Sequence, residues 1–146
     1  MSFTVTTIGV TKLRTSLRQK KNKLGKRRAV NKQAVVQIDN WIQKNFRDEG
    51  DRAHPGTGWK PLKESTKRGR RGTAPYKILQ DTGHLKGRWK HFYDNDTALI
   101  QSGVDYGSFH QQGSGKLPQR RILPTRDQIL PILKLLYRKF VKVSIQ

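Results

Sequence analysis

One apolar stripe constrains the fold of this chain more than any other feature. Between residues 29 and 46 the apolar side chains recur every three or four positions, and they belong to Val30, Ala34, Val35, Ile38, Trp41, Ile42 and Phe46. This spacing predicts an amphipathic α-helix of about five turns that buries one face, with Trp41 in the core. The pattern fails and a glycine follows at residues 48–50, so we expect the helix to end there.

Weaker patterns predict short strands and a second helix. Residues 1–10 alternate β-branched and polar side chains, which is typical of a strand or an extended arm. Residues 87–93 and 97–103 flank the turn sequence Asp-Asn-Asp and predict a β-hairpin. Three further elements are expected toward the C-terminus: a short strand at 120–123, a helix that Thr125 caps and Pro131 delays or bends, and a last strand at 140–145.

This order of elements indicates an α+β fold, a small and mainly antiparallel sheet with a long N-terminal helix and a C-terminal helix packed on it. We divide the chain into an extended strand and basic arm at 1–28 and a single α+β domain at 29–146. The domain includes a long, flexible loop at about 50–75, rich in glycine and proline, of a length typical of functional or disordered segments. With 146 residues, the chain can bury one core without disulfides or metals.

The charge of the chain restricts its partners. It has 31 lysine and arginine residues against 10 aspartate and glutamate residues, a formal net charge of +21. This charge calls for a polyanion, an acidic protein surface or dilution in a larger assembly. The arm also has a sparse helical stripe of three leucines, so it is either a solvated segment or one that orders on a partner. Candidate contacts to DNA or to a partner are Lys12, Arg14, Arg18, Lys20, Lys21, Lys23, Lys26, Arg27 and Arg28 in the arm, and Lys67, Arg68, Arg70 and Arg71 in the loop.

Composition and spacing argue against several classes of site. The chain has no cysteine, so we expect no disulfide, no cysteine-based zinc site and no thiol chemistry. No histidine pair has the spacing of a helical zinc motif and the glycines match no phosphate-binding loop, so we expect no metal and no cofactor. No apolar run is long enough to span a bilayer and the first residues do not resemble a signal peptide, so we expect a soluble, unexported chain without a membrane partner.

Two segments, ILQDTGHL at 78–85 and YGSFHQQG at 106–113, have the composition of catalytic loops. A small hydrolase would use Asp81 with His84 or His110 as a general acid–base pair. Aspartic proteases normally need two Asp-Thr-Gly segments, and because this chain has one, only a homodimeric protease would be possible. The same residues suit a turn in which side chains of Asp81 and its neighbours cap backbone amides and the glycine adopts a left-handed conformation. We favour the turn, expect no enzymatic activity, and predict that Asp81→Ala impairs folding or assembly.

Four motifs follow one another along the chain: GTGWKPL at 56–62, ILQDTGHLKG at 78–87, YGSFHQQG at 106–113 and LPQRRILP at 117–124. Their order after a long helix and before a C-terminal one resembles the phage virion morphogenesis family, the tail-completion proteins of Mu-like and P2-like tailed phages. The resemblance covers roughly residues 29 to 138. Its motif positions in this sequence are Trp59, Pro61, Leu62, Leu79, Asp81, Thr82, Gly83, Leu85, Tyr106, His110, Gly113, Pro118 and Arg120.

The resemblance implies a structural virion protein without catalysis. It implies a homo-oligomeric, six-fold ring in the neck or at the head-proximal end of the tail, present in the host cytoplasm during assembly. The ring would dock between a connector or head-closure protein and a tail terminator or tube protein, with Arg120 and Arg121 as candidate contacts between subunits. Basic residues facing the channel would contact packaged DNA without reading its sequence. The alternative is a basic nucleic-acid-binding accessory protein without catalytic activity.

Overall fold

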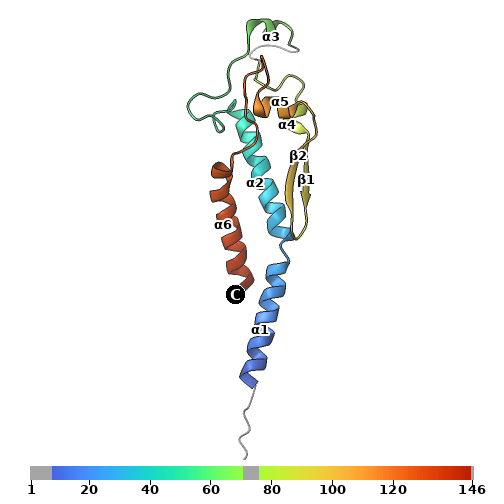
Figure 1. The fold of residues 1–146 in the computed structure, drawn as a ribbon, viewed down its shortest axis with the longest axis vertical. Helices are drawn as coiled ribbons and strands as arrows, with labels where there is room; N and C mark the ends of the chain where they lie inside the picture. The colour runs from blue at the N-terminus through green and yellow to red at the C-terminus, as the bar shows by residue number, and fades with distance from the viewer. Residues whose placement is uncertain (1–7, 71–75, 146) are drawn as a thin grey trace, which may run out of the picture.

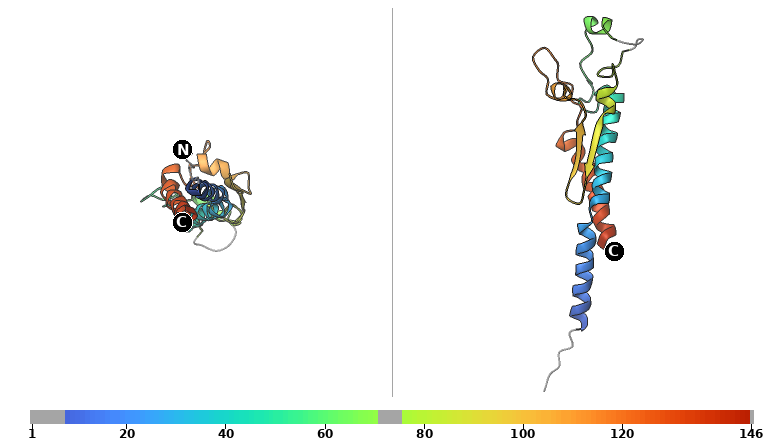
Figure 2. Two further views of the ribbon diagram at one scale, coloured as in Figure 1. Left: turned by 90° about the horizontal axis from the view of Figure 1, so that it is seen from below. Right: turned by 90° about the vertical axis from the view of Figure 1, so that its right-hand side faces the viewer.

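The computed structural model describes residues 8–70 and 76–145 of the chain. Its elements are α1 (Ile8–Gly25), α2 (Arg28–Arg47), α3 (Glu64–Arg68), α4 (His84–Gly87), β1 (Trp89–Tyr93), β2 (Ala98–Ser102), α5 (Gly107–Gln112) and α6 (Arg126–Ile145). The molecule is elongated: α1 continues the line of α2, and α6 runs back beside them (Figure 1). In Figure 1, α2 lies between α6 and the hairpin, and the right-hand view of Figure 2 shows the same elongated shape from the side of the hairpin.

Helix α2 is the predicted amphipathic helix, and it organises the core. Six stripe residues of α2 are buried, with Ile42 and Phe46 fully enclosed, and the partly buried Ile38 packs against them. The core is completed by apolar side chains from segments far apart in the sequence, namely Ala53, Trp59, Ile78, Leu85 and Ile122. Most of the stability of a helix in a protein comes from packing of its apolar face, so burial of this continuous face is what stabilises α2. As predicted, α2 ends immediately before residue 48.

The hairpin confirms the expected antiparallel sheet and the α+β class. Trp89 in β1 pairs with Ser102 in β2, and Tyr93 pairs with Ala98. Both strands lie against α2, while α6 packs along α1 and α2. The two-stranded sheet therefore covers one side of α2 and α6 covers the other (Figure 1).

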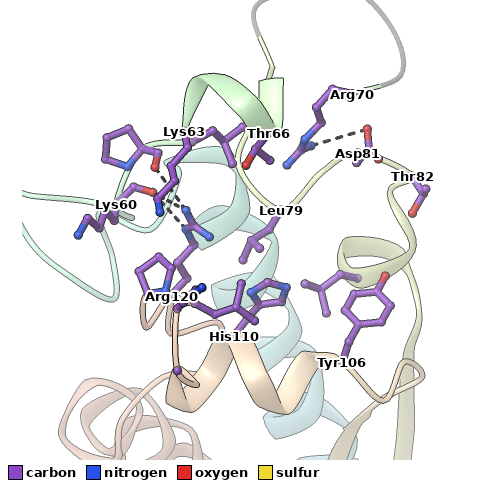
Figure 3. Close-up of a pocket in the computed structure, with 17 residues that line it drawn as sticks. Lys60, Lys63, Thr66, Arg70, Leu79, Asp81, Thr82, Tyr106, His110 and Arg120 are labelled. Atoms are coloured by element: carbon purple, nitrogen blue, oxygen red, sulfur yellow. Dashed lines mark hydrogen bonds and ion pairs between the residues drawn. The ribbon is translucent and has the colours of Figure 1, made fainter. Parts of the chain in front are cut away.

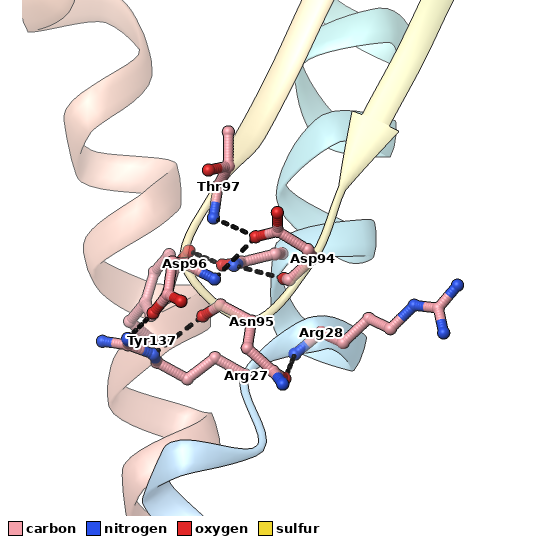
Figure 4. A network of polar contacts seen from close by, with 8 residues as sticks. Arg27, Arg28, Asp94, Asn95, Asp96, Thr97 and Tyr137 are labelled. Carbon is pink, nitrogen blue, oxygen red and sulfur yellow. Dashed lines mark hydrogen bonds and ion pairs between the residues drawn. The ribbon is translucent and has the colours of Figure 1, made fainter.

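The turn of the hairpin ties three elements together (Figure 4). Arg27, between α1 and α2, forms an ion pair with Asp96 at 2.6 Å and donates a hydrogen bond to the Asn95 carbonyl at 3.0 Å. Asn31 of α2 donates to the Asp94 carbonyl at 2.8 Å and accepts a hydrogen bond from the hydroxyl of Tyr137 in α6. The turn thus fixes the point where α1 meets α2.

The strand predicted at 140–145 is wrong, and so is the described part of the strand or extended arm predicted at 1–10. Residues 8–10 form the first turn of α1, because extending an existing helix costs less than starting a new element; residues 1–7 lie outside the described residues. Residues 140–145 are the last turns of α6, whose apolar positions keep helical spacing where the helix packs on α1 and α2. Helix α6 begins at Arg126 and contains Pro131 within it.

The strand predicted at 120–123 is also wrong, because side chains supply the hydrogen bonds that a neighbouring strand would make. The amide of Ile122 donates to Oε1 of Gln111 at 2.7 Å. The carbonyl of Arg121 accepts a hydrogen bond from Nε1 of Trp59 at 3.0 Å. Backbone groups satisfied in this way need no ladder, so the segment is held in place without strand pairing.

Candidate functional site

The structure brings most of the predicted motif residues to one pocket, at the end of the molecule opposite α1 (Figure 3). The pocket has a volume of about 550 Å³, within the range of sites that bind ligands or side chains of a partner. Ten of the thirteen motif positions line it: Pro61, Leu62, Leu79, Asp81, Thr82, Leu85, Tyr106, His110, Pro118 and Arg120.

The three remaining motif residues support the pocket without lining it. Trp59 is buried in the core and packs edge-on against Phe46, with ring centroids 5.3 Å apart. Gly83 precedes α4 with a φ of 74°, which is the left-handed conformation predicted for it. Gly113 follows α5 with a φ of 77°, so both glycines end or begin a helix where side chains are disfavoured.

Arg120 is the most constrained charged group of the pocket. It is 6% exposed, and its Nε and Nη2 donate to the Lys60 carbonyl at 3.1 and 2.9 Å. Its amide donates to the His110 carbonyl at 2.8 Å, which fixes the segment after α5. Burial, followed by the nearby charge of Arg70, lowers the pKa of Arg120. The motif arginine therefore holds the wall at Lys60 while it adds positive charge to the pocket.

Arg70 and Asp81 face each other across the rim. Their closest charged atoms, Nη1 and Oδ1, are 3.9 Å apart. Arg70 Nη1 also donates to the Lys77 carbonyl at 3.3 Å. The Arg70 side chain is 11% exposed and that of Asp81 is 38% exposed. A pair at this separation and exposure is weak, on the order of 1 kcal/mol or less.

His110 is held in a neutral state. Its ring packs edge-on against Tyr106, with centroids 6.2 Å apart, and its Nδ1 is buried without a hydrogen-bond partner among the described residues. Burial and then the charge of Arg120 lower the pKa of His110. The other histidine named above as a catalytic candidate, His84, has its Nε2 3.3 Å from Nη2 of Arg88 on the exposed surface.

Several pocket residues were not identified from the sequence. Lys60, Lys63, Lys116 and Leu117 line the pocket together with the motif residues and with Thr66, which follows GTGWKPL as part of the resemblance. Lys60 stands inside GTGWKPL, Leu117 is the first residue of LPQRRILP, and Lys116 directly precedes it, so their positions in or beside motifs were the available signal. Isolated lysines usually belong to solvated surfaces, and the sequence does not indicate that these face a common cavity.

The predicted basic contacts fall into two groups. Arg27 and Arg28 are engaged within the chain: Arg27 with the hairpin turn, and Arg28 with its guanidinium 5.9 Å from the centre of the Tyr93 ring. In the loop, Lys67 forms an ion pair with Glu64 at 2.6 Å. Arg71 and the side chain of Lys12 lie outside the described residues. Exposed positions are Arg14, Arg18, Lys20, Lys21, Lys23, Lys26 and Arg68.

In the part of the chain that the structure describes, no three histidine, aspartate or glutamate side chains are grouped so that they could hold a metal ion. No helix among those residues has the length and apolar character needed to cross a membrane.

Comparison with curated proteins and with solved structures returned no match. A family model does match, and its match runs over residues 8–132. The matched segment begins with α1, so it includes the basic arm that the resemblance of motifs left out, and it contains every residue lining the pocket. The match covers well over half of the chain, and the chain therefore belongs to the phage virion morphogenesis family.

Proposed function

We propose that this virion morphogenesis protein is a tail-completion or neck component, which joins the head of a tailed phage to its tail. One observation carries the proposal: two dissimilar surfaces suited to partners lie at opposite ends of an elongated molecule (Figures 1 and 2). One end has the motif-lined pocket. The other has α1, which contains no acidic residue and exposes Leu13 and Leu17. A joint between two bodies needs two such ends.

The proposal assigns no catalysis to the pocket. Its charged lining consists of Asp81 and five lysines and arginines, of which Arg70 and Arg120 are tied to backbone carbonyls. General acid–base catalysis needs two groups that exchange protons near neutral pH. Burial and then the charge of Arg120 lower the pKa of His110, so its ring carries no proton to donate there. These features favour binding an anion over turning over a substrate.

Neighbouring copies would form the six-fold ring through the flanks of the molecule. On one flank the hairpin exposes Phe92 and Leu99, a cross-strand pair with 48% of each residue accessible. On the other flank α6 exposes Leu135 and Val141, at 57% and 42%. Because these two flanks lie on opposite sides of α2, contact between them is head-to-tail, the type of interface that closes into rings.

Deletion of the gene from the phage or prophage that carries it tests the proposed function. We expect filled heads and complete tails that fail to join, and joining restored by the intact gene supplied in trans. Negative-stain microscopy of the purified chain should show rings. Joined, infectious particles from the deletion strain would contradict the proposal.

The same strain separates this proposal from the alternative, an accessory DNA-binding protein. Replacing Arg14, Arg18, Lys20, Lys21 and Lys23 of α1 by glutamine would then abolish salt-sensitive DNA binding while heads and tails still join. If the protein is a joint component instead, the same substitutions leave the amount of packaged DNA unchanged, whether or not the variant is found in the particle.

A further inference from the structure

We propose that the pocket receives an acidic peptide segment of a different virion protein, with one bulky apolar side chain inserted between the carboxylates that flank it. This inference rests on the proposed function and specifies the partner at the pocket end of the molecule. Three features of the pocket carry it: unbalanced charge, an uncovered apolar floor and a strained residue in that floor (Figure 3).

The charge of the pocket calls for a carboxylate from outside. Lys60, Lys63, Lys116, Arg70 and Arg120 line it, against the single carboxylate of Asp81. Within the described residues the buried guanidinium of Arg120 makes no ion pair, and it bonds to neutral carbonyls only. Its pKa is lowered in part by Arg70, so two guanidinium groups repel each other there. An entering carboxylate relieves this repulsion and gains charge-assisted hydrogen bonds.

The floor of the pocket calls for an apolar side chain. Leu117 and Tyr106 are 46% and 43% exposed, and Leu62, Leu79 and Pro118 are half-buried. Such a concave apolar surface is typical of a pocket that takes an anchor residue from a partner. A free phosphate or a DNA backbone would satisfy the charge but would leave this surface exposed to water.

Leu79 shows that the floor is held in a costly conformation. Its φ is 59°, in the left-handed region that leucine rarely adopts. Figure 3 shows its side chain in the middle of the pocket, between Arg120 and Asp81. Strain of this kind persists where the surrounding structure imposes it, and it clusters at binding sites. A glycine would serve the turn alone at lower cost, so the leucine is needed for its side chain, which packs against the core and forms part of the pocket floor.

Charge complementarity selects another protein over a second copy. A second copy brings a net charge of +21 to a basic pocket. Its densest acidic segment, residues 48–51, is already engaged within its own chain: Asp48 pairs with Arg52, and Glu49 and Asp51 accept hydrogen bonds from backbone amides. A segment with several carboxylates and no neighbouring lysines therefore has to come from a different chain.

A photo-crosslinking residue placed in the pocket of the full chain tests this inference inside assembled particles. The deletion strain is complemented with Leu117→p-benzoylphenylalanine, particles are irradiated, and the crosslinked peptide is identified by mass spectrometry. The control places the same probe at Phe92, on the hairpin flank. We expect the Leu117 probe to link a segment of another virion protein with at least two carboxylates near an apolar residue, and the Phe92 probe to link elsewhere.

Charge reversal of the pocket gives a second readout. Lys63→Glu with Lys116→Glu should lower the titre of joined particles about tenfold or more. The matched control, Lys32→Glu with Lys44→Glu at exposed positions of α2, changes the net charge equally outside the pocket and should leave the titre unchanged. A crosslink from Leu117 to this same chain, to DNA, or to no partner in particles that contain the protein overturns the inference and leaves the proposed function intact. Absence of the chain from purified particles refutes both.

Discussion

Gly50→Ala should destabilise the protein far more than the same change at another left-handed glycine. Gly50 has a φ of 89°, and a Cβ added there would lie 2.2 Å from Cδ1 of Trp59. Real side chains do not approach this closely, so the indole has to move. Gly56 has a similar φ of 77°, but a Cβ there would meet no atom within 4 Å. Comparison of the two variants isolates the contact with Trp59.

The magnitude follows from what the indole would lose. The shared cost of a left-handed alanine is about 1 kcal/mol, and it applies to both variants. At Gly50, overpacking adds about 1–3 kcal/mol. Displacing Trp59 also weakens its 3.0 Å hydrogen bond to the Arg121 carbonyl and its edge-on contact with Phe46, each worth about 1 kcal/mol. We therefore expect a loss of about 3–5 kcal/mol for Gly50→Ala and about 1 kcal/mol for Gly56→Ala.

Urea unfolding followed by far-ultraviolet circular dichroism measures both losses, and near-ultraviolet circular dichroism reports on the packing of the tryptophans. A third variant checks the cause: in a Trp59→Leu background the smaller side chain leaves room, so the cost of Gly50→Ala should shrink toward that of Gly56→Ala. Equal losses for the two glycine variants, or an unchanged cost in the Trp59→Leu background, would refute the reasoning.

Three further predictions concern polar groups. Asn45 is fully buried and donates to the carbonyls of Arg121 and Ile122. Asn45→Asp should therefore lower the free energy of unfolding in urea by about 2–4 kcal/mol. The same change at the exposed Asn40 of the same helix should lower it by almost nothing. The pKa of His110 is lowered in the folded protein, so as the pH falls the unfolded chain binds this proton first. The contribution of His110 to the free energy of unfolding should be full above about pH 6.5 and fall below it. In urea titrations His110→Phe should flatten this dependence of stability on pH, whereas the control His84→Gln, at an exposed position, should not. The pKa of Asp94 is lowered by hydrogen bonds from the amides of Asp96 and Thr97. The contribution of Asp94 to stability is therefore present above the ordinary aspartate pKa and is lost in more acidic solution. Asp94→Ala should reduce hydrogen-exchange protection across the hairpin at about pH 7, and unchanged protection would contradict this role.

Elements with a local signal were predictable from the sequence. The stripe of α2 depends only on spacing within one segment, and the hairpin depends on a turn sequence between two short alternating runs. The strands expected at 120–123 and 140–145 failed because a short apolar alternation does not specify its partner. In the first case Gln111 and Trp59 supply the hydrogen bonds, and in the second α6 gains more by packing along α1 and α2.

The residues of the candidate site were predictable from the sequence, but their convergence on one pocket was not. Four ordered motifs identified ten of the residues that line the pocket, although each motif alone reads as a turn or a loop. Their convergence depends on contacts over long sequence separations, such as that of Arg120 with the carbonyls of Lys60 and Pro61. The left-handed Leu79 had no signal, because leucine is among the residues least suited to that conformation.

The charge of the chain links its stability to its assembly. The described residues contain four ion pairs of lysine or arginine with a carboxylate, formed by Arg27, Arg52, Lys67 and Arg70. With 31 basic residues in all, most positive charges have no such partner in the free chain, and their mutual repulsion opposes compact folding. Anything that neutralises them and binds only the folded state stabilises that state by mass action. The free protein should therefore gain stability with added salt, and it should gain more from an acidic partner that also covers the apolar floor of the pocket, because salt screens the charges without burying Leu117 or Tyr106.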